Sequence, residues 1–276
     1  MEIFPVTSQS ELGVFALGLI IAGAVSGLAA GALGIGGGIV IIPVLYHVMT
    51  ALGVGAGVRM HVAVGTALAA AIPAALTTAR AARSEVAWKL LRVQVASVLA
   101  GTVAGCTLVA LAKGGSLTVL FALAALPVLP YLVFERKRRT PNGAATESIF
   151  GFCIFLSVLM GTALTRLAID LIRGTDLGSS KPNMDENRAT ASALALIVAT
   201  AGTVTLIVAG WNAPDLPPDS IGYVNLLGFA LIAPVLLATE PAGAALAHIM
   251  DLRRLRLVFA GLVAITTARM LWDAFV

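Results

Sequence analysis

Two stretches of the sequence could bind a small anion, and the first is rich in glycine. Five glycines fall within residues 31–38, between two apolar runs. Glycine lets backbone N–H groups approach a ligand closely, and N–H groups at a helix N-terminus attract anions. The alternative is that these glycines only allow helices to pack closely. We predict that four of them bind substrate: Gly34, Gly36, Gly37 and Gly38.

The second stretch carries two opposite charges inside an apolar run. Arg166 and Asp170 are at positions i and i+4, so they share one face of a helix. Charges at membrane depth are costly and usually face a cavity or a partner. We predict that Arg166 attracts an anionic substrate and that Asp170 holds Arg166 or exchanges a proton. The alternative is a structural ion pair in which the arginine reaches toward lipid headgroups.

The composition defines the environment in which these residues work. Of 276 residues, 59% are hydrophobic and 12% charged, and the mean hydropathy is +0.97. A water-soluble protein carries about 25% charged residues, so we predict an all-α polytopic membrane protein. The net charge of +4 does not indicate nucleic-acid binding. The basic residues gather in short loops between apolar runs, which is the pattern of the positive-inside rule.

The apolar runs outline the helices. A helix needs about 20 residues to cross a bilayer, and the runs at 35–50, 148–160 and 162–172 are shorter than that. We interpret these three as half-helices or re-entrant arms. The run at 221–250 contains two prolines, so we expect it to be kinked or broken. With the remaining runs the chain has about eight transmembrane segments, or up to ten if the arms are counted. These remaining runs lie at 12–33, 61–79, 90–112, 117–134, 188–210 and 257–275.

The loops between the runs indicate the orientation. Basic residues concentrate at 80–92, 136–139 and 253–256, and the positive-inside rule places these loops in the cytoplasm. The loop at 211–219 and the first eleven residues contain no lysine or arginine. We therefore expect both termini of this multi-pass protein to lie outside.

The two halves of the sequence resemble each other. Residues 63–68 match residues 189–194 at an offset of 126 (189 − 63), and positions within 99–122 match positions within 237–260 at an offset of 138 (237 − 99). We interpret 12–33 with 35–50, and 148–160 with 162–172, as a pair of arms at the start of each half. Three spans follow each pair, an odd number, so the halves run through the membrane in opposite directions. Such inverted repeats are typical of secondary transporters, with the substrate site at their interface. The predicted parts are a first repeat at 1–134, a cytoplasmic linker at 135–147 and a second repeat at 148–276.

Two hydroxyl side chains occupy equivalent positions in the repeats. Thr66 in the first match corresponds to Ser192 in the second. We predict that each hydroxyl donates to an oxygen of the substrate, one from each half. The alternative is that each bonds the carbonyl four residues earlier in its own helix, or a neighbouring helix.

Several motifs together resemble the TauE/SafE sulfite exporter family, over roughly residues 14–275. The resemblance implies export or uptake of small sulfur oxyanions and organosulfonates across the bacterial inner membrane, and we expect an exporter. One departure is clear, because family members usually carry a second glycine-rich motif where this chain has Gly161 to Asp170. The substrate could therefore differ from sulfite, or the second half could be a gate or a structural partner. The matching motifs are Gly34–Gly38 with Pro43, Gly65-Thr66, Ile221–Asn225, Pro234, Gly243 and Leu255 through Leu271.

The sequence therefore predicts a transporter rather than an enzyme. No HExxH pattern or zinc spacing involves the three histidines, and the glycine run is not GxGxxG, so we expect no metal, cofactor or nucleotide. His61 is expected to lie at the membrane interface, with a proton-accepting role as the alternative. The expected partners are a small anion, the lipid bilayer, a coupling ion (H⁺ or Na⁺) if uptake is driven, and in one alternative a second copy of the chain. An anion channel and a carrier for another anion, such as a carboxylate, remain open.

Overall fold

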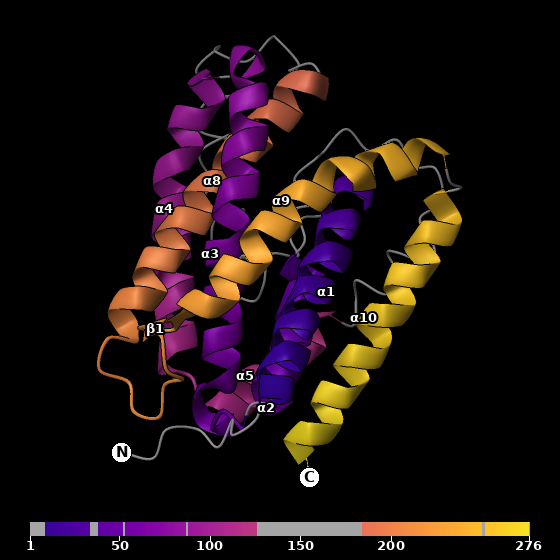
Figure 1. The fold of residues 1–276 in the computed structure, drawn as a ribbon. Helices are drawn as coiled ribbons and strands as arrows, with labels where there is room; N and C mark the ends of the chain where they lie inside the picture. The colour runs from indigo at the N-terminus through magenta and orange to yellow at the C-terminus, as the bar shows by residue number, and fades with distance from the viewer. Residues whose placement is uncertain are drawn as a thin grey trace.

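The computed structural model describes six stretches of the chain: residues 9–33, 38–51, 53–86, 88–125, 184–249 and 252–275. These stretches are almost entirely helical (Figure 1). The first half contains α1 (Gln9–Leu33), α2 (Gly38–Ala51), α3 (Ala56–Ala81), the short 3₁₀ helix η1 (Arg83–Glu85), α4 (Trp88–Leu111) and α5 (Gly114–Ala125). The second half contains α8 (Met184–Ala209), β1 (Ser220–Ile221), β2 (Val224–Asn225), α9 (Leu226–Ile249) and α10 (Leu252–Phe275).

The prediction of an all-α membrane protein is confirmed. Four helices in the described residues are long and apolar enough to cross a bilayer, namely Ala56–Ala81, Gln94–Leu111, Ser192–Ala209 and Leu226–Leu246. With 14 residues, α2 is too short to cross and matches the expected short arm. Large apolar side chains such as Leu17, Val208 and Val258 point outward, as lipid contact requires. The linker at 135–147 and the second pair of arms lie outside the described residues.

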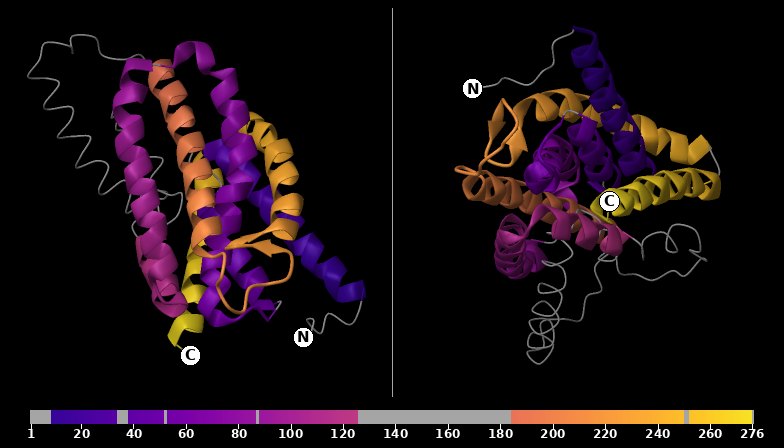
Figure 2. Two further views of the ribbon diagram at one scale, coloured as in Figure 1. Left: turned by 90° about the vertical axis from the view of Figure 1, so that its left-hand side faces the viewer. Right: turned by 90° about the horizontal axis from the view of Figure 1, so that it is seen from below.

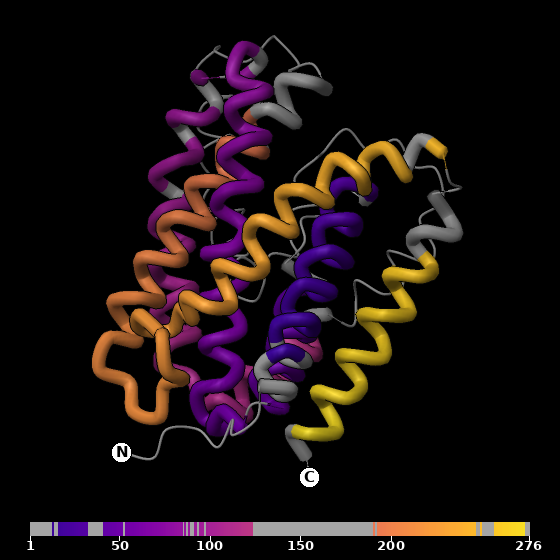
Figure 3. Tube along the Cα trace, in the orientation of Figure 1, coloured from indigo at the N-terminus to yellow at the C-terminus, as the bar shows by residue number. Residues whose placement is uncertain are grey.

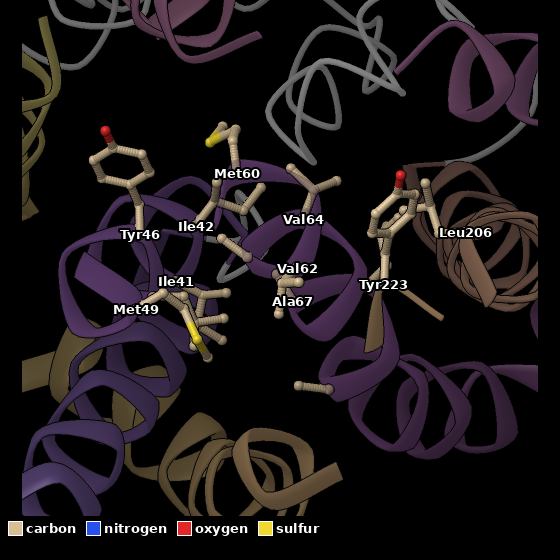
Figure 4. Packing of buried hydrophobic residues seen from close by; sticks show 14 of the residues in the cluster. Ile41, Ile42, Tyr46, Met49, Met60, Val62, Val64, Ala67, Leu206 and Tyr223 are labelled. Carbon is tan, nitrogen blue, oxygen red and sulfur yellow. The ribbon is translucent and has the colours of Figure 1, made fainter. Parts of the chain in front are cut away.

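Helix α3 is the centre of the molecule. Every residue from Met60 to Ala71 is buried. Ile41, Ile42 and Tyr46 of α2 pack on one side of α3, and Leu206 of α8 and Tyr223 pack on another (Figure 4). Small residues make this possible, since alanine and glycine let neighbouring helices approach closely.

The last three helices of each half correspond in position along the chain. The first residues of α4 and α9 are related by an offset of 138 (226 − 88), and their last residues are related by the same offset (249 − 111). The offset between the starts of α5 and α10 is also 138 (252 − 114), and that between the starts of α3 and α8 is 128 (184 − 56). These offsets agree closely with those of the sequence matches.

Corresponding helices run in opposite directions. In Figure 1, α3 rises and α8 descends beside it, while α4 descends and α9 rises. Helix α8 lies between α3 and α4 (Figure 2). In the same way α3, which corresponds to α8, contacts both α8 and α9, which corresponds to α4. Helices α5 and α10 also contact each other. This reciprocal packing is what an inverted repeat requires, and it agrees with the predicted repeat for α3, α4, α8 and α9.

The longest helix interface joins α1 to α9. Three glycines of α1, spaced four residues apart, face the backbone of α9 at Ile232, Leu236 and Glu240. A Cβ atom at Gly27 would meet the Thr239 hydroxyl, and one at Gly31 would meet the Glu240 carbonyl. Gly27 and Gly31 therefore allow α1 and α9 to pack closely.

Helix α9 continues through both of its prolines. It forms one helix from Leu226 to Ile249 that contains Pro234 and Pro241, so of the two expected outcomes, a kink or a break, the break does not occur. Its path is curved in Figure 3. Proline removes one backbone hydrogen bond and crowds the preceding turn, and packing along α1 holds the helix together at these points.

Candidate functional site

A short β-hairpin seats the start of α9 against the middle of α3. Strands β1 and β2 pair antiparallel, with Ser220 opposite Asn225 and Ile221 opposite Val224. Gly222 closes the turn at φ +56°, a conformation that glycine adopts without strain. The hairpin lies against α3 and α8. It therefore joins the first half of the chain to the second close to the sequence match that contains Thr66.

Asn225 is fully engaged at this junction. Its backbone N–H donates to Thr66 Oγ1 at 3.0 Å, and its Oδ1 accepts from the Gly228 N–H at 2.7 Å. The second bond makes Asn225 the N-cap of α9, because it satisfies an N–H that the first helical turn leaves free. Its Nδ2 also donates to Pro218 O at 3.1 Å. Asn225 thus fixes both the position and the start of α9.

Glycine allows the hairpin to approach both helices. A Cβ atom at Gly65 of α3 would meet the Tyr223 carbonyl, and one at Gly210 would lie 2.8 Å from the Tyr223 ring. The Tyr223 N–H donates to Leu206 O at 3.3 Å. Burial raises the pKa of the Tyr223 phenol, so this hydroxyl stays neutral at physiological pH.

His61 lies beneath Tyr223 and is only 2% exposed. The two rings stack with centroids 4.9 Å apart. Nε2 lies 3.0 Å from Val109 O and 3.1 Å from Ala112 O, at the C-terminal end of α4. With two carbonyl acceptors beside it, Nε2 carries a proton and donates. The packing of Tyr223 and α4 encloses this side chain in protein, and its depth at the membrane interface stays a prediction.

The predicted site residues fall into two groups, those that the structure describes and those that lie outside the described residues. Thr66 is fully buried and its oxygen accepts the bond from Asn225, while Ser192 lies half-buried on the corresponding helix α8. Gly38 is the first residue of α2. Their substrate contacts remain predictions. The others, which lie outside the described residues, are Gly34, Gly36, Gly37, Arg166 and Asp170.

The structure adds Glu240, which the sequence reading passed over. Its backbone carbonyl lies against Gly31, two residues before the end of α1 and therefore close to the start of the glycine-rich run. Its carboxylate is partly buried, and the Thr78 side chain of α3 lies within hydrogen-bonding reach. The signal was present in the sequence, because Glu240 is the sole acidic residue between Asp219 and Asp251. An ionisable residue inside a transmembrane segment is by itself an indication of function.

A second polar cluster lies where α2, α3 and α10 meet. Arg59 donates from Nε and Nη2 to Val54 O at 3.1 and 2.8 Å, and its guanidinium covers the Tyr46 ring at 5.5 Å. His47 Nδ1 lies 3.9 Å from Asp273 Oδ2. These contacts tie the α2–α3 turn and the end of α10 together, so we assign them a structural role.

Comparison with known proteins gives two matches. A family model described as "Sulfite exporter TauE/SafE" matches residues 19–270, from within α1 to within α10. A curated protein of Haemophilus influenzae, described as "Probable membrane transporter protein", is 22% identical over 260 residues, which cover 89% of this chain and 94% of that protein. No solved structure gives a significant match.

Proposed function

The chain belongs to the TauE/SafE sulfite exporter family, and from that premise we propose that it carries a small sulfur-containing anion across the membrane by alternating access. We propose sulfite or an organosulfonate as the substrate. The observation that carries the proposal is the family match, which extends over nearly all of the described helices. The similar protein of Haemophilus influenzae is described as a transporter without a named substrate.

The arrangement of the helices supports a carrier mechanism. Helices α3 and α4 in one half and α8 and α9 in the other run in opposite directions and exchange contacts reciprocally. In transporters with inverted repeats, one half rocks against the other around a site near the bilayer centre. Here that interface consists of α3 against α8 and α9, with the hairpin at its edge.

We propose that the glycine-rich run shapes the anion pocket. Helix α2 begins at Gly38, so its first turn carries N–H groups without helical partners and the positive end of the helix dipole. In this proposal Arg166 selects the anion from the other half and Asp170 positions Arg166. In this proposal Thr66 and Ser192 line the anion pocket, one from each half of the chain.

The proposed orientation places both termini outside the inner membrane. Helix α1 begins and α10 ends at the same end of the molecule (Figure 1). The turn between α3 and α4, with Arg80 and Arg83, lies at the opposite end, which is the cytoplasmic one by charge. Fusion of alkaline phosphatase to the C-terminus should give an active reporter; an inactive phosphatase with a fluorescent GFP fusion would overturn this orientation.

Flux measurements in proteoliposomes test the function. Purified protein should take up labelled sulfite or methanesulfonate with saturation, and trans-loaded substrate should accelerate uptake by counterflow. Flux that neither saturates nor shows counterflow would indicate a channel. Saturable succinate flux without sulfite or sulfonate flux would favour a carboxylate carrier. Empty liposomes and liposomes with an unrelated membrane protein are the controls.

A further inference from the structure

The turn between α3 and α4 carries an exposed basic cluster at one end of the molecule. We propose that this turn and the exposed face of α4 bind an anionic phospholipid, with the lipid phosphate on the arginines and an acyl chain along α4. Such a lipid is a partner of the protein whatever substrate it carries. The site consists of Arg80, Arg83, Trp88 and Arg92, together with the stripe of α4 residues that follows them.

The arginines of this turn are free to bind a ligand. Arg80 lies in the last turn of α3, Arg83 begins η1, and Arg92 lies in the second turn of α4. All three are exposed. Within the stretches that the structure describes, no hydrogen bond or ion pair engages their guanidinium groups. Each guanidinium therefore keeps its N–H donors available.

A lipid phosphate group matches these donors. A guanidinium group presents several N–H donors in one plane and binds phosphate oxygens with paired hydrogen bonds. The phosphate of a zwitterionic lipid comes with a cation in the same headgroup, and the arginines repel that cation. An anionic lipid has no such cation, and its attraction grows with each basic side chain at the membrane surface. The cluster therefore favours an anionic phospholipid over a zwitterionic one.

Trp88 indicates the depth of the cluster in the membrane. It is the first residue of α4 and is 52% exposed. Exposed tryptophan is enriched at the level of the lipid headgroups, because its ring is apolar and its N–H is polar. Arg92 lies one turn further along α4, about 6 Å along the helix axis, and an arginine side chain is long enough to reach back to the headgroups. The tryptophan and the arginines therefore meet the same layer of the bilayer.

A stripe of exposed residues continues from Trp88 along α4. Arg92, Ala96, Leu99 and Val103 follow at spacings of three or four residues, which places them on one face of the helix. Leu99 and Val103 are 37% and 46% exposed. Beyond Arg92 these residues are apolar, so they suit an acyl chain. The headgroup and a chain of one lipid thus find adjoining surfaces on the same helix.

Packing against α8 holds the turn in place. Val86 and Leu91 are only 8% and 7% exposed, and they pack against Ala193, Leu194 and Ile197 of α8. The arginines therefore extend from a turn that is anchored on both sides of η1. A preformed surface loses less conformational entropy when a ligand binds, which favours a bound lipid over a passing one.

Quenching of Trp88 fluorescence tests the site directly. Trp211→Phe together with Trp272→Phe leaves Trp88 as the single tryptophan of the full chain. This protein is reconstituted in phosphatidylcholine bilayers, and a small fraction of the lipid carries bromine on its acyl chains. The brominated lipid is phosphatidylglycerol in one series and phosphatidylcholine in the other. Bromine quenches tryptophan only at short range, so the comparison reports which headgroup lies beside Trp88 more often.

Two double variants with the same change in charge are compared in this background. Arg83→Gln with Arg92→Gln removes two cations of the cluster. Lys113→Gln with Arg269→Gln removes two exposed cations near the ends of α4 and α10, at the opposite end of the molecule (Figure 1). Arg80 stays in place, because a cation in the last turn of α3 stabilises that helix.

The anionic lipid should win the comparison in the unsubstituted cluster. Its relative binding constant at Trp88 should exceed that of phosphatidylcholine at least about fivefold. The Lys113 and Arg269 variant should keep this preference, and the Arg83 and Arg92 variant should lose it. Equal quenching by the two brominated lipids in the unsubstituted cluster overturns the inference. A preference that survives without Arg83 and Arg92 overturns it too, and so does a preference that both variants lose, because overall charge would then explain it.

Single variants cover the case in which the double variant does not purify as a monodisperse protein. Arg83→Gln and Arg92→Gln should each lose part of the preference, and the inference is wrong if neither does. The readout does not require transport. If purified protein carries neither sulfite nor a sulfonate, the proposed function fails while the lipid site stands or falls on the quenching alone.

Discussion

The backbone N–H of Asn225 donates a 3.0 Å hydrogen bond to the Thr66 hydroxyl oxygen across 159 positions of sequence. This bond joins the middle of α3 to the first residue before α9, and both groups are buried. It is a direct polar link between the halves of the chain inside an otherwise apolar core.

Thr66→Val should destabilise the protein. Valine keeps the shape but removes the acceptor, so a buried N–H of Asn225 loses its partner, at a cost of about 1–3 kcal/mol. Thermal unfolding in detergent measures the loss. Thr107→Val is the control, because the Thr107 hydroxyl is exposed and bonds only Val103 O of its own helix. An unchanged melting temperature in Thr66→Val would contradict the structural role.

The same variant separates structure from transport. If Thr66 also donates to substrate, Thr66→Val should raise the KM for sulfite or methanesulfonate in proteoliposomes. An unaltered KM in folded protein would leave Thr66 as a structural residue alone. The Thr66 hydroxyl would then act only as the hydrogen-bond acceptor of the Asn225 N–H.

Gly31→Ala should weaken the α1–α9 interface. The new Cβ would lie 2.8 Å from Ala244 N and against the Glu240 carbonyl, and these backbone atoms cannot turn away. Forcing an extra methyl group into such packing costs roughly 1–3 kcal/mol. Gly57→Ala is the matched control, since nothing lies within 4 Å of its Cβ and alanine favours a helix. Equal melting temperatures for the two variants would refute the close contact.

His61→Phe should also lower the melting temperature. Phenylalanine can keep the ring stack on Tyr223 but removes the N–H that both carbonyls share, and Val109 O then keeps only the Ala112 N–H at 3.2 Å. We expect a loss of about 1–3 kcal/mol. Tyr223→Phe keeps the ring and removes only a hydroxyl, so it should change stability by less than about 0.5 kcal/mol. The assignment fails if His61→Phe is as stable as Tyr223→Phe.

Arg166→Ala should weaken anion binding more than it weakens folding. A cation close to an anionic substrate is worth about 1.5–3 kcal/mol as a charged hydrogen bond, which corresponds to a KM at least about tenfold higher. Arg138→Ala, in the predicted cytoplasmic linker, removes the same charge elsewhere and should leave KM unchanged. Wild-type transport by expression-matched Arg166→Ala and Asp170→Ala would exclude the pair from the site.

Hydropathy and repeat matching could predict the helices but not the contacts between them. The offset of 138 seen in scattered residues of 99–122 and 237–260 is the offset at which α4 and α9 begin and end. The hairpin escaped prediction because strands of two residues carry no periodic signal and lie among turn residues. Burial of His61 also depends on Tyr223, which is 162 positions away (223 − 61), and no local pattern reports such a contact.

The prolines of α9 show the opposite case, in which a local sequence rule predicts a disruption that the fold does not show in full. The local rule that proline disrupts a helix predicts a kink or a break in the segment at 221–250. Packing of α9 along the glycines of α1 overrides that rule. Glu240 was overlooked for a related reason, since its neighbours along the chain are apolar and its relation to the glycine-rich run exists only in three dimensions.

The complete burial of α3 from Met60 to Ala71 has a consequence for how the protein responds to its bilayer. Over this length α3 has no lipid-facing side, so a change in bilayer thickness cannot act on it directly. Outer helices such as α8 and α10 expose valine and isoleucine and must tilt or slide to match a thinner or thicker hydrocarbon layer. A change in lipid composition would therefore affect α3 only through movements of the helices that surround it.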